Sequence, residues 1–169
     1  MTIGHRMKSI LIIGAGGHGR VVAEIAEDLG YERIGFLDDN SETAIGKLKD
    51  MEQFIEYGEA VCGIGNNTVR KQVLDRLEGV GYKIPCLIHP SAYISRSAVI
   101  EKGVVIEPGA VVNANSHIGY GSIISVGAIV DHDTVIGVCA HINAGAIVKA
   151  GAKVADYTRV DAGCVVNGY

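Results

Sequence analysis

The chain has 169 residues, a net charge of −4, 23 glycines and no tryptophan. Without a basic cluster there is no electrostatic case for binding nucleic acid or an anionic membrane surface, and no apolar run is long enough to span a bilayer. Four cysteines without CxxC spacing, and no recognisable secretory leader, predict reduced thiols in a cytoplasmic protein. We expect residues 1–7 to form a disordered tail.

Residues 8–87 alternate apolar strands with amphipathic helices. Strands are predicted at 9–13, 33–37, 60–64 and 82–88, and helices at 19–29 and 68–77, the second capped by Asn67 or Thr68. The alternation is typical of a small Rossmann-like α/β domain with a four-stranded parallel sheet. Three of these strands end in polar loop residues, and ligands bind at the carboxyl ends of parallel strands.

The first strand and the first helix are joined by Gly14-Ala15-Gly16-Gly17-His18-Gly19. In this context the turn fits the template that places a dinucleotide pyrophosphate on a helix N-terminus, with Asp38 near the distance of the ribose-binding acid. Two features argue against NAD. A sheet of four strands has no second mononucleotide-binding half, and the His18 ring occupies a position where the phosphate usually approaches the backbone closely. The pattern favours a nucleotide or sugar ligand over NAD, and a purely structural turn is the third interpretation.

Residues 88–169 repeat with a period of six. Isoleucine or valine occupies every sixth position from Ile88 to Val166, and the position four later is always small or β-branched. Alternate residues of a strand point the same way, so both positions face inward, their neighbours face outward, and the last two residues form a corner. We expect positive φ at the second corner position, where glycine or asparagine recurs at 103, 109, 115, 121, 127, 145, 151 and 163. Three strands per coil predict a parallel β-helix of about four and a half coils.

One corner carries residues suited to proton transfer. His132 holds the first corner position, outside the predicted core, and Asp133 the second, where glycine is usual. An imidazole titrates near neutrality and suits proton removal from an attacking amine or hydroxyl. A non-glycine residue at positive φ can mark a functional site, although Cys139 and Tyr157 share that slot. Asp131, on the outward face, is an alternative acid for orienting the ring.

Several motifs in chain order resemble the sialic-acid O-acetyltransferase family, which includes N-acetyltransferases of UDP-linked 4-amino sugars such as the bacillosamine precursor. They are the glycine-rich turn, Phe36-Leu37-Asp38-Asp39, Gly63-Ile64-Gly65-Asn66-Asn67 with Arg70-Lys71, Val130-Asp131-His132-Asp133 and Ala140-His141-Ile142. The resemblance covers nearly the whole chain. It implies a left-handed β-helix in a homotrimer with sites between subunits, a sugar or nucleotide-sugar on the N-terminal domain, and acetyl-CoA along the β-helix without a metal.

The resemblance also implies roles for single residues. His132 would be the general base and Asp133 the acid that orients it. The acceptor site would be formed by Gly16, Gly17, His18, Asp38, Asp39 and Asn66, and the coenzyme side by His141, Gly145 and Gly163. Two departures stand out: relatives often have asparagine where this chain has Ser125, and they usually continue for more repeats beyond Tyr169. We therefore expect a β-helix domain at 88–169 that is short at its C-terminus.

The expected function is direct acetyl transfer from acetyl-CoA to an amino or hydroxyl group of a nucleotide-linked sugar or sialic acid. The amino acceptor is favoured, since Asp38 and Asp39 could hold an aminosugar cation. One alternative is a non-catalytic trimer that binds a sugar or nucleotide. Another is a zinc-dependent lyase of the carbonic-anhydrase type, which needs three converging histidines. His117, His132 and His141 have a spacing that fits this poorly, and solvent or subunit packing is the other explanation for His117 and His141.

Overall fold

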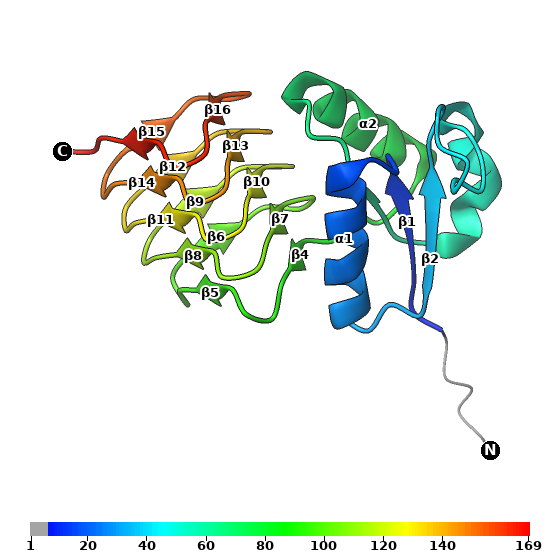
Figure 1. The fold of residues 1–169 in the computed structure, drawn as a ribbon, viewed down its shortest axis with the longest axis horizontal. Helices are drawn as coiled ribbons and strands as arrows, with labels where there is room; N and C mark the ends of the chain where they lie inside the picture. The colour runs from blue at the N-terminus through cyan, green and yellow to red at the C-terminus, as the bar shows by residue number, and fades with distance from the viewer. Residues whose placement is uncertain (1–6) are drawn as a thin grey trace, which may run out of the picture.

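The computed structural model describes residues 7–169, so residues 1–6 of the predicted tail lie outside the described part of the chain. A small α/β domain is followed by a β-helix, and the two lie side by side, with the helix α1 between the α/β sheet and the coils (Figure 1). The helix α2 packs on the other face of the sheet. Within residues 7–169, no helix is long and apolar enough to cross a membrane. The four cysteines are free thiols.

The α/β domain has a parallel sheet in the order β2-β1-β3, formed by β1 (Ser9–Ile13), β2 (Arg33–Leu37) and β3 (Ala60–Cys62). Its helices are α1 (Gly17–Asp28), the 3₁₀ helix η1 (Leu48–Tyr57) and α2 (Asn67–Val80). The predicted α/β class is confirmed, and η1 is an element that the pattern did not indicate.

The sheet has three strands where the pattern predicts four. Residues 82–86 make one parallel bridge, between Glu59 and Lys83, and the chain then leaves the sheet. Pro85 follows this bridge and has no N–H to extend a ladder, so the pairing ends there. The end of the predicted strand, Leu87–Ile88, belongs to the β-helix instead, where it is the strand β4.

The β-helix consists of two-residue strands stacked in three parallel sheets. The first face holds β4 (Leu87–Ile88), β7 (Val105–Ile106), β10 (Ile123–Ile124), β13 (His141–Ile142) and β16 (Arg159–Val160). The second face holds β5 (Tyr93–Ile94), β8 (Val111–Val112), β11 (Ile129–Val130), β14 (Ile147–Val148) and β17 (Val165–Val166). The third face holds β6 (Val99–Ile100), β9 (His117–Ile118), β12 (Val135–Ile136) and β15 (Lys153–Val154).

The repeat register is confirmed residue by residue. The inward positions form one core of Ile, Val and Ala. All eight corner positions predicted to have positive φ do have it, and so do Asp133, Cys139 and Tyr157. The corner between the second and third faces, here called the far corner, lies opposite the first face and holds residues 95–98, 113–116, 131–134 and 149–152. His132 and Asp133 are therefore on the far corner.

The α/β domain packs against the first face. The outward residues Leu87 and Val105 are buried there in one cluster with side chains of α1 and β1. Arg70, only 1% exposed, extends from α2 and donates to the backbone oxygens of Gly121 and Cys139 at 2.7 and 2.8 Å. It also donates to the carbonyls of Ile64 and Gly65. Its guanidinium therefore joins α2, the loop after β3 and the corner between the third and first faces of the β-helix. The two domains are thus joined by both apolar and polar contacts.

Candidate functional site

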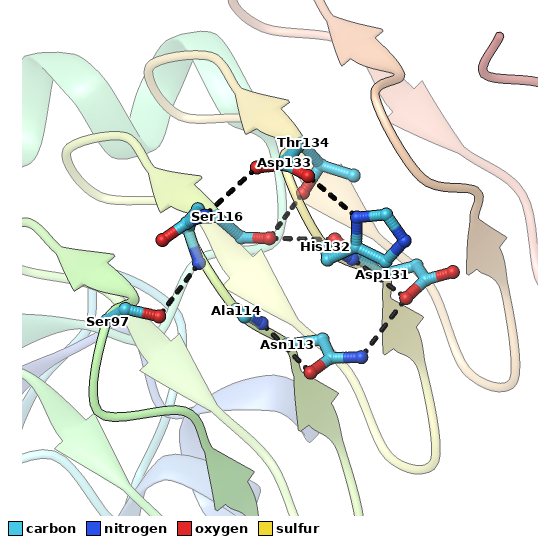
Figure 2. A network of polar contacts seen from close by, with 9 residues as sticks. Ser97, Asn113, Ala114, Ser116, Asp131, His132, Asp133 and Thr134 are labelled. Atoms are coloured by element: carbon cyan, nitrogen blue, oxygen red, sulfur yellow. Dashed lines mark hydrogen bonds and ion pairs between the residues drawn. The ribbon is translucent and has the colours of Figure 1, made fainter.

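The far corner carries a histidine paired with an acid. Nδ1 of His132 lies 2.7 Å from Oδ2 of Asp133, and both side chains are about half exposed (Figure 2). With the carboxylate ionised, Nδ1 carries the ring proton and donates a hydrogen bond to Asp133. Nε2 then presents a lone pair toward solvent, which is the state that a general base requires.

The two acids that flank the imidazole have different roles. Asp133 contacts the ring, whereas Oδ1 of Asp131 accepts a hydrogen bond from the backbone N–H of His132 at 2.8 Å. Each acid also accepts a hydrogen bond from a side-chain amide of the preceding coil. Asn113 donates to Asp131 at 3.1 Å, and Asn115 donates to Asp133 at 3.2 Å. Of the two acids that the sequence offered, Asp133 is the one that contacts the ring, and Asp131 bonds to the corner backbone.

The charges of this corner raise the basicity of the imidazole. The hydrogen bond to Asp133, aided by the nearby charge of Asp131, raises the pKa of His132 above its ordinary value. The same bond and that from Asn115 lower the pKa of Asp133, while the backbone N–H of His132 lowers the pKa of Asp131. Both acids are ionised at neutral pH, so the imidazole keeps its orienting partner.

A second polar cluster lies between the glycine-rich turn and the first face. Nδ1 of His18 is 3.3 Å from Oε1 of Glu107, whose Oε2 accepts the N–H of Val126 at 2.9 Å. Nε2 of His141 is 3.0 Å from Oγ of Ser125, and the His18 and His141 ring centroids are 6.3 Å apart. Among residues 7–169, His18 Nε2 and His141 Nδ1 are buried without a hydrogen-bond partner.

The histidine pKa in this second cluster is shifted in the direction opposite to that at the far corner. Burial, followed by the positive charge of Arg70 and by His18, lowers the pKa of His141 to about 4. His141 is therefore neutral at physiological pH. Although burial works against it, the hydrogen bonds from His18 and from the Val126 N–H lower the pKa of Glu107. This cluster therefore holds a neutral His141 and an ionised Glu107.

The glycine-rich turn contains glycines of two kinds. A Cβ on Gly19 would lie 2.0 Å from the carbonyl oxygen of Gly14, so close packing requires that glycine, and Gly14 itself has φ of +103°. A Cβ on Gly16 or Gly17 would meet nothing within 4 Å, and neither residue has positive φ. Packing thus explains Gly14 and Gly19, whereas Gly16 and Gly17 leave an open surface at the start of α1.

The predicted acidic and amide residues at the strand ends bond to backbone groups. Asp38 accepts the N–H of Ala15 at 2.8 Å, and those of two residues in its own loop, which together lower its pKa. Asp39 accepts the N–H of Leu48 at 3.0 Å. Asn66 caps α2 by accepting from Val69. These side chains shape the loops at the carboxyl edge of the sheet, beside the glycine-rich turn.

The residues predicted to form one site are divided within a single chain. His18 and His141 meet at the first face, while His132 and Asp133 lie at the opposite corner of the prism. Gly145 and Gly163 lie on the corner between the first and second faces, where a Cβ would meet no atom within 4 Å.

His117 lies apart from both groups, on the third face, with its Nε2 2.6 Å from Oε1 of Glu101. Within residues 7–169, no three His, Cys, Asp or Glu side chains are grouped as metal ligands.

Sequence reasoning missed the side chains that support these groups. Asn113 and Asn115 lie one coil, or 18 residues, before Asp131 and Asp133. Each asparagine donates a hydrogen bond to the acid one coil after it. The signal was therefore present in the repeat register. Arg70 was noted only as part of a motif, and nothing in the repeat indicated that it would reach the β-helix.

The α/β part of the chain matches the family described as the PglD N-terminal domain over residues 9–77. A curated relative, the UDP-N-acetylbacillosamine N-acetyltransferase of Bacillus subtilis (strain 168), is 37% identical over 111 residues. The match covers 59% of this chain and 51% of that protein, so the chain spans about half the length of this relative.

Solved structures match nearly the whole chain. The acetyltransferase domain of PglB from Neisseria gonorrhoeae is 30% identical with a TM-score of 0.75, and covers 95% of this chain and 92% of its own. That domain has also been solved in complex with acetyl coenzyme A. PerB from Caulobacter crescentus, in complex with CoA and GDP-perosamine, is 29% identical with a TM-score of 0.82, and covers 96% and 90%.

Proposed function

This chain belongs to the hexapeptide-repeat family of sialic-acid O-acetyltransferases and UDP-4-amino-sugar N-acetyltransferases, and from this premise we propose that it transfers the acetyl group of acetyl-CoA to an amino group of a nucleotide-linked sugar. The observation that carries the proposal is the pairing of His132 Nδ1 with Asp133 Oδ2 at 2.7 Å on an accessible corner of a β-helix. Relatives whose names or complexes state a nucleotide sugar or acetyl coenzyme A support the donor and the acceptor class.

The far corner accounts for the proton in this reaction. The sugar nitrogen forms a bond to the acetyl carbonyl carbon, and the C–S bond of the thioester breaks. Nε2 of His132 takes the proton that the nitrogen loses and passes it to the departing CoA thiolate. Asp133 holds the Nδ1–H tautomer and stabilises the imidazolium between the two proton transfers. A neutral amine or a hydroxyl satisfies the same proton balance, so the acceptor atom is decided by the sugar that the α/β domain holds.

The start of α1 is the proposed site for the anionic part of the acceptor. Its N-cap residue, Gly16, makes no side-chain cap, whereas α2 is capped by Asn66. Uncapped N–H groups at a helix N-terminus favour a phosphate or another anion. The open surface at Gly16 and Gly17 lets a ligand approach the backbone there. His18, Asp38 and Asp39 would border this position.

The coenzyme is placed along the β-helix, on the side of His141, Gly145 and Gly163. His141 is neutral, and its Nδ1 is buried without a protein partner among residues 7–169, so a hydrogen bond to a ligand amide or hydroxyl would satisfy it once the ring turns or its neighbours move aside. The two glycines leave the corner backbone uncovered. Pantetheine, with its amides and narrow chain, has the chemistry that suits such an edge.

The division of the site requires a second copy of the chain. Within one chain the acceptor turn lies at the first face and His132 at the opposite corner, so we infer a homotrimer in which the turn of one subunit meets the His132 of its neighbour. A column of exposed apolar side chains on the second face, beside the far corner, supports this packing; it consists of Tyr93, Ile129, Ile147 and Val165. We place the trimer in the cytoplasm, where the four free thiols would persist.

A thiol-release assay with acetyl-CoA tests the proposal. The acceptor panel contains a UDP-4-amino sugar, a GDP-4-amino sugar, sialic acid, and the same nucleotide sugars with hydroxyl in place of the amine. We expect CoA release only with amino sugars, and its loss in His132→Ala. Release with hydroxyl acceptors alone would contradict N-acetylation. Binding of the sugars without any release would favour the alternative of a non-catalytic binding protein.

A further inference from the structure

The three corners of the β-helix differ in what occupies their positive-φ positions. On the corner between the first and second faces these are all glycine: Gly109, Gly127, Gly145 and Gly163. On the corner between the third and first faces they are Gly103, Gly121, Cys139 and Tyr157. Only the far corner places two polar side chains in succession, Asn115 with φ of 57° and Asp133 with φ of 58°. A non-glycine residue there costs roughly 1 kcal/mol, so side-chain interactions must offset that cost.

The offsetting interaction is a ladder along the far corner. Oγ of Ser97 accepts the backbone N–H of Asn115 at 3.0 Å, and Nδ2 of Asn115 donates to Oδ1 of Asp133 at 3.2 Å. The other oxygen of Asp133 contacts Nδ1 of His132. Ser97, Asn115 and Asp133 each lie one coil beyond the one before, and Asp133 contacts the proposed base in its own coil. Figure 2 labels Ser97, Asp133 and His132 along this corner.

The inside of the prism fixes the same corner. Oγ of Ser116 donates to the backbone oxygen of Asp131 at 2.7 Å, and Oγ1 of Thr134 donates to Ser116 at 3.0 Å. Both hydroxyls are buried. The backbone on either side of His132 is therefore held, and the freedom that remains is rotation of the Asp133 carboxylate. Asn115 is the contact that limits this rotation.

We propose that Asn115 is a positioning residue that holds the Asp133 carboxylate in line with Nδ1 of His132. The inference rests on the proposed function, because it concerns the base of the transfer reaction. An amide suits this position because it donates to the carboxylate without adding charge. A second carboxylate at 3.2 Å would repel Asp133, and a glycine would leave Asp133 free to rotate toward water.

Two substitutions of Asn115 have opposite expected effects on the imidazole. Asn115→Gly keeps the left-handed backbone but removes the amide, so the hydrogen bond to His132 weakens and the pKa of His132 falls. Asn115→Asp is nearly isosteric and adds a negative charge, so the pKa of His132 rises. The charged groups that act on the ring are Asp131 and Asp133. In the repeat register, Lys149 lies one coil beyond Asp131 and Arg96 lies two coils before His132. None of these is altered.

The experiment is an NMR titration of the ¹⁵N-labelled imidazoles of the full chain, alongside the pH profile of kcat. The His132 signals are identified by their absence in His132→Ala. In Asn115→Gly we expect the NMR signals to show a smaller fraction of the Nδ1–H tautomer of His132. The acid limb of the kcat profile should move to lower pH, and kcat should fall roughly tenfold while the KM for acetyl-CoA stays unchanged. In Asn115→Asp the acid limb moves to higher pH. The matched control, Tyr157→Gly, makes the same backbone change on another corner and should leave the titration and the acid limb unchanged.

Two results would overturn the positioning role. One is an Asn115→Gly titration that superimposes on that of the wild type. The other is a shift of both Asn115 variants in the same direction, which would indicate general damage to the corner. The titration needs no substrate. If the wild type releases no CoA with any sugar, the proposed function fails, and the imidazole signals still decide whether Asn115 positions Asp133.

Discussion

His132 and His141 stand nine residues apart in the same β-helix, both outside its core, yet their surroundings give them opposite properties. His132 is half exposed and beside two carboxylates, so its pKa is raised. His141 is packed beneath the α/β domain, near Arg70 and His18, and its pKa is lowered to about 4. The repeat places each side chain on a face or a corner, and the neighbours that pack there decide its protonation.

The difference divides the chemistry between two parts of the molecule. Near neutral pH, His132 can gain and lose a proton, whereas His141 stays neutral and can only form hydrogen bonds. This difference supports the proposed base at the far corner and the proposed ligand contact at the first face. Four predictions break or sharpen this comparison.

The largest effect is expected from substitution of the two histidines by asparagine. His132→Asn removes the base and should lower kcat by on the order of 10²- to 10⁴-fold, with little change in KM. His141→Asn keeps a neutral polar group and should mainly raise the KM for acetyl-CoA, by roughly threefold to tenfold. Steady-state thiol release at saturating sugar measures both. Equal losses of kcat in the two variants would contradict the division of roles.

The pH dependence of kcat should report His132. A general base acts when unprotonated, so the rate is low below the His132 pKa and rises as the pH passes through it. Because that pKa is raised, the midpoint should lie above the ordinary histidine value of about 6.5. Asp133→Asn removes the cause, so the midpoint should move to lower pH while kcat falls roughly 10- to 100-fold. An unchanged midpoint in Asp133→Asn would show that another group controls the profile.

Removal of Arg70 tests the first-face side of the comparison. Arg70→Met leaves the buried carbonyls of Gly121 and Cys139 without their donor, so we expect a loss of about 2–4 kcal/mol in the free energy of unfolding. It also removes a positive charge that lowers the pKa of His141, which should therefore rise. Urea denaturation and NMR titration measure the two effects. Arg76→Met, on the exposed side of the same helix, is the control and should cost less than about 0.5 kcal/mol.

The smallest change separates the two kinds of glycine in the turn. Gly19→Ala places a Cβ 2.0 Å from the Gly14 carbonyl oxygen and should destabilise the fold by about 1–3 kcal/mol. Gly16→Ala meets no atom, so the fold should be unaffected while the KM for the nucleotide sugar rises. Thermal unfolding and sugar-dependent kinetics of the pair separate the outcomes. An unchanged sugar KM in Gly16→Ala would place the acceptor elsewhere.

The periodicity of the second half predicted most of the architecture, because hexapeptide repeats allow little variation in strand, corner and core position. The same register predicted positive φ at Asp133 as well as at the glycines. It did not predict which face the α/β domain covers, and that packing determines the surroundings of His141. The fourth strand failed at Pro85, where a missing donor outweighed an apolar pattern. Contacts between coils, such as Asn115 with Asp133, require the eighteen-residue step to be followed through the corners.

The most direct test is complementation between two inactive variants of the chain. His132→Ala lacks the base, and Gly16→Trp fills the open surface of the acceptor turn. Each alone should release no CoA above background. Co-expressed with different tags and purified as mixed trimers, they should recover about a third of the wild-type rate, because in either kind of mixed trimer one site in three combines an intact turn with a neighbour's intact His132. A mixed preparation no more active than either variant alone would contradict a site shared between subunits.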